Sequence, residues 1–95
     1  MWSYERQERH DKKGRRWHFV YHDLDGSNTP YEEQPFEIYF RDDDRTVFGV
    51  LRFERRKDNP YRDYGTMVNK IMNDADFRNS LTDPETESVW KRNWK

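Results

Sequence analysis

The stretch Phe36–Phe53, FEIYFRDDDRTVFGVLRF, carries the clearest fold signal in the sequence. On both sides of its three consecutive aspartates, large apolar side chains alternate with other residues, which is the pattern of two strands joined by a turn. We expect a turn of two or four residues, and either length gives the same three pairs on one face: Phe40 with Val47, Ile38 with Gly49, and Phe36 with Leu51. This face of the predicted hairpin is wholly apolar and needs a covering layer.

A further strand is predicted before this hairpin, over Arg16–His22. Aromatic residues occupy alternate positions there, and β-branched or aromatic side chains dominate the segment. Gly14 marks a turn just upstream, because glycine tolerates a positive φ. Residues 2–9 would then form a first strand, although a short polar helix fits them too because they contain no apolar stripe. Residues 23–35 are predicted to be a loop, since one glycine and two prolines interrupt them.

Helices are predicted only in the last third of the chain. Asn59 and Pro60 suit the N-cap and the first position of a helix. Apolar residues then recur at three- and four-residue spacing, which gives one stripe: Tyr61, Tyr64, Val68, Ile71, Met72 and Ala75. A capping box from Thr82 to Glu85 predicts a second helix start. The apolar side of this second helix would hold Val89, Trp90 and Trp94.

The apolar face of the hairpin and the apolar stripe of the helix can both be buried by packing against each other, and this packing determines the fold class. The sequence predicts an α+β domain, an antiparallel β-meander of three to four strands with one or two C-terminal helices packed on one face. With 95 residues and 11.9 kDa, we expect one small domain over residues 1–95. Residues 1–14 would be either flexible or an edge strand.

Composition excludes several classes of protein. The chain has no cysteine, so it has neither a disulfide scaffold nor a thiol nucleophile. No stretch approaches the roughly 18 apolar residues of a membrane span, and we expect a cytoplasmic protein without a membrane partner. Neither a glycine-rich phosphate loop nor a nucleophile elbow is present. A small hydrolase-like or metal-dependent enzyme is therefore the least favoured function, and no cofactor is expected.

Two segments resemble metal sites in their residue types, but the spacing of their residues argues against metal binding in both. His18 and His22 would share a face on a helix, but four residues along a strand separate them by about 13 Å, too far to share one ion. Asp23–Asn28 offers the oxygen ligands of a calcium loop. Its glycine is fourth rather than sixth, however, and Gln34 stands where a bidentate glutamate is required. We therefore predict no metal site.

The favoured function is a small, non-enzymatic binding domain that acts through a protein–protein or self-association surface. The sheet face turned away from the predicted helix carries aromatic and apolar residues, and the sequence offers no second layer to cover it. Exposed apolar patches of this kind are where a partner or a second copy docks, and we expect a homodimer or a protein partner. The C-terminal tryptophans could instead cap the protein's own core. The predicted binding residues are His18, Val20, His22, Tyr39, Phe48, Val50, Trp90 and Trp94.

A nucleic-acid-binding domain is the alternative. Basic residues adjoin aromatic ones at two strand ends, and they would converge at one sheet edge if the first strand paired beside the third. Against this function stand 19 acidic residues and a pI of about 6.3, which lower the affinity for a polyanion. The residues of this alternative are Lys12, Lys13, Arg15, Arg16, Arg55, Arg56 and Lys57.

Overall fold

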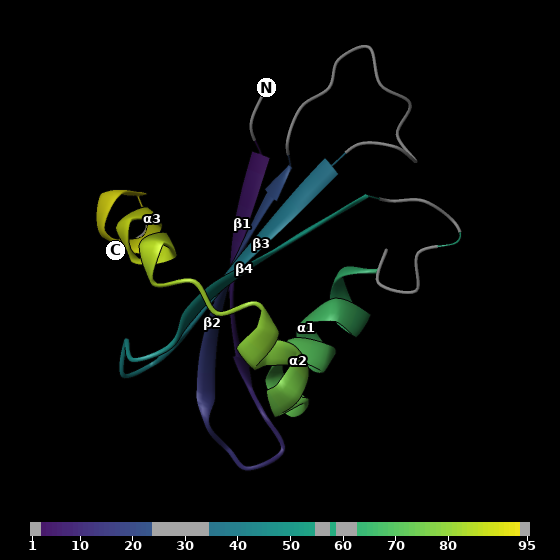
Figure 1. The fold of residues 1–95 in the computed structure, drawn as a ribbon, viewed down its shortest axis with the longest axis vertical. Coiled ribbons are helices and arrows are strands. Elements are labelled where there is room, and N and C mark those ends of the chain that lie inside the picture. Colours follow the sequence, from purple (N-terminus) through teal and green to yellow (C-terminus); the bar gives the residue numbers. More distant parts are fainter. Residues whose placement is uncertain (1–2, 24–34, 55–57, 59–62, 94–95) are drawn as a thin grey trace.

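The computed structural model describes residues 3–23, 35–54, 58 and 63–93. Four antiparallel strands form one open sheet in the order β1-β2-β3-β4, and helices follow them (Figure 1). The strands are β1 (Ser3–His10), β2 (Arg16–Asp23), β3 (Pro35–Asp42) and β4 (Phe48–Glu54). The helical segments are α1 (Tyr64–Asn73), α2 (Ala75–Ser80), the 3-10 helix η2 (Pro84–Thr86) and α3 (Glu87–Asn93). The predicted α+β meander is confirmed.

The first strand lies at one edge of the sheet and pairs with β2 along its whole length. In the turn between them, Gly14 adopts a φ of 82°, the positive value that the sequence predicts there. The Asp11 carboxylate holds this turn, because it accepts hydrogen bonds from the backbone N–H groups of Lys13 and Arg15. Of the two predicted alternatives for this segment, the strand is correct and the polar helix is wrong.

The predicted register between β3 and β4 is wrong by two residues. The observed apolar pairs are Phe40 with Gly49, Ile38 with Leu51, and Phe36 with Phe53. Residues 43–47 connect the two strands, so the turn is longer than expected and moves each partner further along β4. Because side chains alternate with a period of two, this shift leaves every residue on its predicted face. Gly49 permits the close approach of the Phe40 ring, since a Cβ at this position would lie 2.2 Å from Phe40 Cζ.

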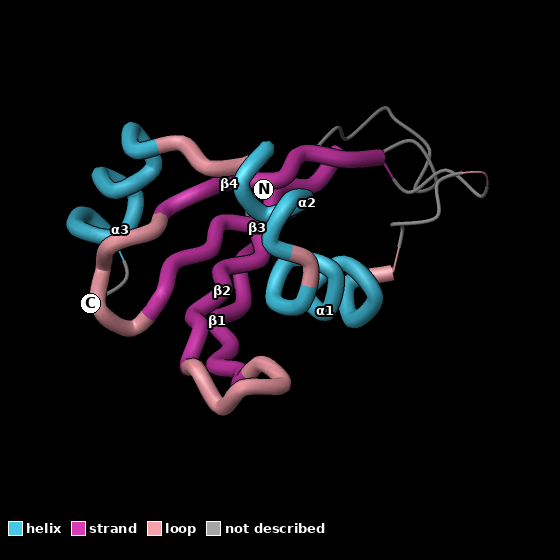
Figure 2. The backbone as a smooth tube through the Cα atoms, turned by 60° about the horizontal axis from the view of Figure 1, so that its bottom comes forward, coloured by secondary structure: helices cyan, strands magenta, loops and turns pink. Residues whose placement is uncertain are grey.

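The main core lies between one face of the sheet, here called the core face, and α1. Figure 2 shows α1 and α2 together on this side of the strands. Each member of this core is at most 5% exposed, and several half-buried residues pack around it. The buried set comprises Trp17, Phe19, Ile38 and Phe40 from the sheet, with Met67, Val68, Ile71 and Met72 from α1. The predicted contact between hairpin and helix is therefore present.

The helices begin and end at aspartates that the sequence analysis did not single out. The predicted cap at Asn59 lies outside the described residues, and α1 begins after Asp63, whose carboxylate accepts from the Thr66 N–H. Asp74 separates α1 from α2 and caps α2 by accepting from the Phe77 N–H. The predicted cap at Thr82 is also displaced by one residue, to Asp83. Each aspartate satisfies an N–H group that the first helical turn leaves without a partner.

The last helix, α3, lies on the opposite side of the sheet from α1 and α2 (Figure 1). Segment 81–83 runs along the start of β4, where the Val50 N–H donates to the Leu81 carbonyl and the Asp83 N–H donates to the Phe48 carbonyl. This short β-like pairing leads the chain across the sheet edge. The helices therefore cover both faces, with α1 and α2 on the core face and α3 on the other.

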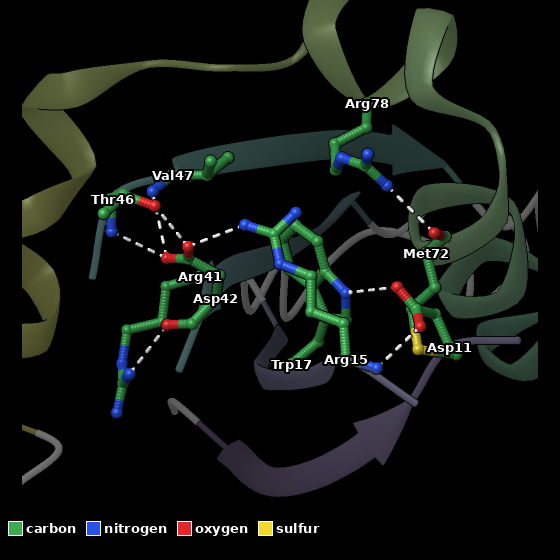
Figure 3. Close-up of polar contacts among 9 residues, drawn as sticks. All are labelled: Asp11, Arg15, Trp17, Arg41, Asp42, Thr46, Val47, Met72 and Arg78. Atoms are coloured by element: carbon green, nitrogen blue, oxygen red, sulfur yellow. Dashed lines mark hydrogen bonds and ion pairs between the residues drawn. The ribbon is translucent and has the colours of Figure 1, made fainter. Parts of the chain in front are cut away.

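The side chain of Asp42 joins the two hairpin turns at one end of the sheet (Figure 3). Its buried carboxylate accepts from the backbone N–H groups of Thr46 and Val47, from the Thr46 hydroxyl and from the Arg15 guanidinium at 2.8 Å. Burial alone would raise the pKa of Asp42, but these hydrogen bonds outweigh it and lower the pKa from 3.8 to about 2. The ionised form is therefore built into the fold.

Because the pKa of Asp42 is lower in the folded protein, its charge stabilises the fold above pH 4, and this contribution disappears as the pH falls towards 2. We predict that Asp42→Asn lowers the free energy of unfolding at pH 7 by roughly 2 kcal/mol. The variant should also lose less stability than the wild type between pH 4 and pH 2. Urea unfolding at several pH values measures both effects. Asp44→Asn, in the exposed part of the same turn, is the control and should match the wild type.

Ile71 tests the packing of α1 on the core face, because its side chain is fully buried. Ile71→Ala should cost about 2–5 kcal/mol through lost burial and a residual cavity. The exposed Asn69 lies on the same helix, and Asn69→Ala should change stability by less than about 0.5 kcal/mol. Equal losses in chemical denaturation would contradict this helix orientation.

Candidate functional site

Most of the predicted protein-binding residues lie together on the face opposite the core face, here called the second face. Val20, Phe48 and Val50 are buried there, whereas His18, His22 and Tyr39 are partly buried. Trp90 of α3 is 3% exposed and forms one cluster with Val20 and Phe48, against which Tyr39 and Val89 pack. Trp94 lies outside the described residues.

The expectation that nothing covers the second face is therefore wrong. Trp90 occupies the apolar part of this face from within the same chain, and the Arg41 guanidinium lies 5.1 Å from the Trp90 ring centre. Arg41 is itself 7% exposed, and this burial lowers the pKa of its guanidinium. Sequence reasoning missed this cover because it treated the tryptophans as an addition to the main core rather than as a second layer.

The other half of the second face carries a polar cluster around Glu37. The Glu37 carboxylate accepts from the Tyr39 hydroxyl at 3.2 Å and from Arg52 Nε at 2.5 Å, and its Oε1 lies 3.8 Å from His22 Nδ1. Burial, together with the neighbouring Glu37 charge, raises the pKa of Tyr39. These contacts satisfy a carboxylate that is only 7% exposed. They have the character of a structural ion cluster.

The strand pairing on which convergence of the basic residues predicted for nucleic-acid binding depended is not observed. β1 lies at the edge and does not adjoin β3, so the condition for convergence fails. Arg15 and Arg16 are at the end of the sheet that holds the acidic turn, where Arg15 pairs with Asp42 and Arg16 lies 3.8 Å from Asp43. β4 ends at the opposite end of the sheet, beside the start of β3. The remaining predicted residues, Arg55, Arg56 and Lys57, lie outside the described residues.

A groove runs between the β1–β2 turn and the junction of α1 with α2. Its inner part has a volume of about 340 Å³, and a larger hollow of about 730 Å³ extends along α1. Asp11, Lys12, Met72 and Asn73 line both parts. The inner part is completed by Lys13, Arg15, Ala75 and Arg78. The outer part is completed by His10, Thr66, Asn69, Lys70 and Asp74. These residues together are called the basic groove.

The carboxylates of the basic groove are already engaged, whereas three of its cations are not neutralised. Asp11 accepts from Trp17 Nε1 and from two backbone N–H groups, and Asp74 pairs with Lys70 at 2.6 Å. Within the described part of the chain, Lys12, Lys13 and Arg78 have no ion pair with a carboxylate. The inner part therefore keeps positive charge for an anion.

Arg78 is held by hydrogen bonds to neutral backbone carbonyls, which do not compensate its positive charge. Its Nη1 donates to the backbone carbonyl of Met72 (Figure 3) and to that of Ile71, both in the last turn of α1. Its guanidinium also lies 4.8 Å from the centre of the buried Trp17 ring, and Arg15 lies 4.6 Å from the same ring. Sequence reasoning missed Arg78 because a single arginine in a short polar segment gives no signal. Because the helix breaks at Asp74, α2 changes direction and Arg78 reaches the carbonyls of Ile71 and Met72.

No group of three or more histidine, aspartate or glutamate side chains in the described ranges lies close enough to hold a metal ion. In the same ranges, no helix is long and apolar enough to cross a membrane. The chain matches no protein-family model, no curated protein and no solved structure.

Phe48 tests whether α3 covers the second face. Phe48→Asp would place a charge in the cluster with Val20 and Trp90, and we predict a loss of about 3 kcal/mol or more in the free energy of unfolding. Phe48→Leu keeps an apolar group and should lose less than about 2 kcal/mol. Thermal or urea unfolding measures the difference. Unchanged stability in Phe48→Asp would mean that this face is open to solvent or to a partner.

Proposed function

We propose that this protein is a non-enzymatic nucleic-acid-binding domain whose basic groove holds the phosphodiester backbone. The supporting observation is the grouping of Lys12, Lys13 and Arg78 around one hollow without a carboxylate partner for any of them among the described residues. Arginine and lysine side chains supply most of the binding energy that proteins draw from nucleic-acid phosphates. Two of the three aspartates in the acidic turn, Asp42 and Asp43, are paired internally, so they contribute little to the repulsion of a polyanion.

The shape of the basic groove favours a polymer over a single phosphate. Beyond the three cations, the groove continues along α1 past Thr66, Asn69 and Asn73. These side chains are spaced at three and four residues, so they share one face of the helix. Hydroxyl and amide groups are common partners of phosphate and sugar oxygens. A linear polyanion could therefore contact the lysines of the turn and this polar stripe at the same time.

The second face supports a protein partner less well. Its apolar centre is already packed against Trp90 of the same chain, and Glu37 beside it is paired with His22 and Arg52. A partner would have to displace α3 or bind over a satisfied ion cluster. Binding at the basic groove requires neither rearrangement.

The proposal is tested by fluorescence anisotropy with labelled mixed-sequence duplex DNA, single-stranded DNA and RNA at several salt concentrations. We predict micromolar binding to at least one of them that weakens as salt rises, because phosphate contacts release counterions. Lys12→Ala combined with Lys13→Ala should weaken binding about tenfold or more and should reduce the magnitude of the salt slope by about one to two.

Lys91→Glu is the matched control, because it changes the net charge by the same two units on α3, away from the basic groove. It should bind nearly as the wild type does. Equal weakening by both variants would indicate general charge attraction without a site. Binding of inorganic phosphate or mononucleotides alone, or absence of binding to every nucleic acid at micromolar protein, would overturn the proposal.

A further inference from the structure

In the part of the chain that the structure describes, no strand pairs with the outer edge of β1. Within the described residues, β1 pairs only with β2 and stands at the end of the sheet. An edge strand presents unpaired N–H and C=O groups, so it is a template for a further strand. The side chains of β1 determine which strand can pair there.

The charges of β1 are complementary to those of a second copy of β1 running in the opposite direction. The segment reads Glu5-Arg6-Gln7-Glu8-Arg9, so reversing it about Gln7 exchanges each acid for a base. In that register, Arg6 stands opposite Glu8 of the second copy and Glu5 stands opposite Arg9. A twofold axis through the two Gln7 residues repeats each pair, which gives four pairs of opposite charge.

The neighbouring registers lack this match. Centring the two strands on Arg6 or on Glu8 places like charges directly opposite at the axis, and a shift of one position in either direction from Gln7 brings two glutamates or two arginines together. Like charges opposite one another are unfavourable in antiparallel sheets. The sequence of β1 thus specifies one register. An edge strand that is protected only by lysines would not specify a register for a second copy.

We infer that two copies of this protein associate through β1 to form a continuous eight-stranded antiparallel sheet. The twofold axis is perpendicular to the sheet, so the core faces of both copies lie on the same side. Arg6 and Glu8 are exposed in the single chain, and the ion pair between Glu8 and Arg16 is long, at 3.5 Å. An exposed ion pair of this kind is weak, so Glu8 can exchange Arg16 for an arginine of the second copy at little cost. His10 at the end of β1 also lines the outer part of the basic groove, but the groove cations Lys12, Lys13 and Arg78 lie outside β1, so this dimer does not require them.

A surface limited to one strand is small, so the dimer should be concentration-dependent and weakened by salt. Sedimentation equilibrium from micromolar to millimolar protein measures the dissociation constant. Arg6→Glu alone places glutamate opposite Glu8 twice, and Glu8→Arg alone places arginine opposite Arg6 twice. We expect each single variant to dimerise at least about tenfold more weakly than the wild type.

Charge exchange separates this inference from a general loss of stability. The double variant Arg6→Glu, Glu8→Arg restores all the complementary pairs and should dimerise as the wild type does. An equimolar mixture of the two single variants should form a heterodimer, because every pair in it is again of opposite charge. Thermal unfolding at low concentration checks that all variants fold.

The inference would be overturned by a wild-type protein that stays monomeric at millimolar concentration. It would equally be overturned by a dimer that both single variants leave unchanged, since that dimer would use another surface. Nucleic-acid binding can fail while this dimer persists, and the reverse also holds, so the two proposals are tested separately.

Discussion

The buried carboxylate of Asp42 is the contact that joins the two hairpin turns of this sheet. It closes the β3–β4 turn through Thr46 and Val47, and it reaches across to Arg15 in the neighbouring hairpin. Arg15 in turn lies over the ring of Trp17, whose indole N–H donates to Asp11. The ionised Asp42 therefore contacts both turns. Through Arg15 and Trp17 the contacts continue to Asp11, the residue that holds the β1–β2 turn beside the basic groove.

The sequence predicted the architecture well because the apolar pattern alone determines it. Alternation over residues 36–53 and the helical stripe through Ile71 require a sheet face packed on a helix, whatever the turn length. Details that depend on single polar contacts were not predictable. Asp42 lengthens the turn and shifts the β3–β4 register, and Asp63, Asp74 and Asp83 set the helix ends, yet each looks like an ordinary acidic residue in an acidic chain.

The candidate site was predicted only in part, for a related reason. Local charge density identifies the lysines of the β1–β2 turn, but it does not reveal which cations meet a carboxylate in the fold. Arg15 and Arg16 are largely neutralised by the acidic turn, whereas Arg78 joins Lys12 and Lys13 because the chain breaks at Asp74. Similarly, the tryptophan at position 90 was identified as an anchor, but its partner is the protein's own second face.

The most direct test of this account is a carbon-detected NMR titration of the Asp42 carboxyl group. If this carboxylate holds both turns, its resonance should titrate with a pKa of about 2, and the amide signals of Thr46 and Val47 and the side-chain signals of Arg15 should shift with the same midpoint. A midpoint near 3.8, the ordinary value for aspartate, would contradict it, as would an Asp42 transition that leaves the Arg15 signals unmoved. The two turns would then be held independently, and the position of the basic groove would need another explanation.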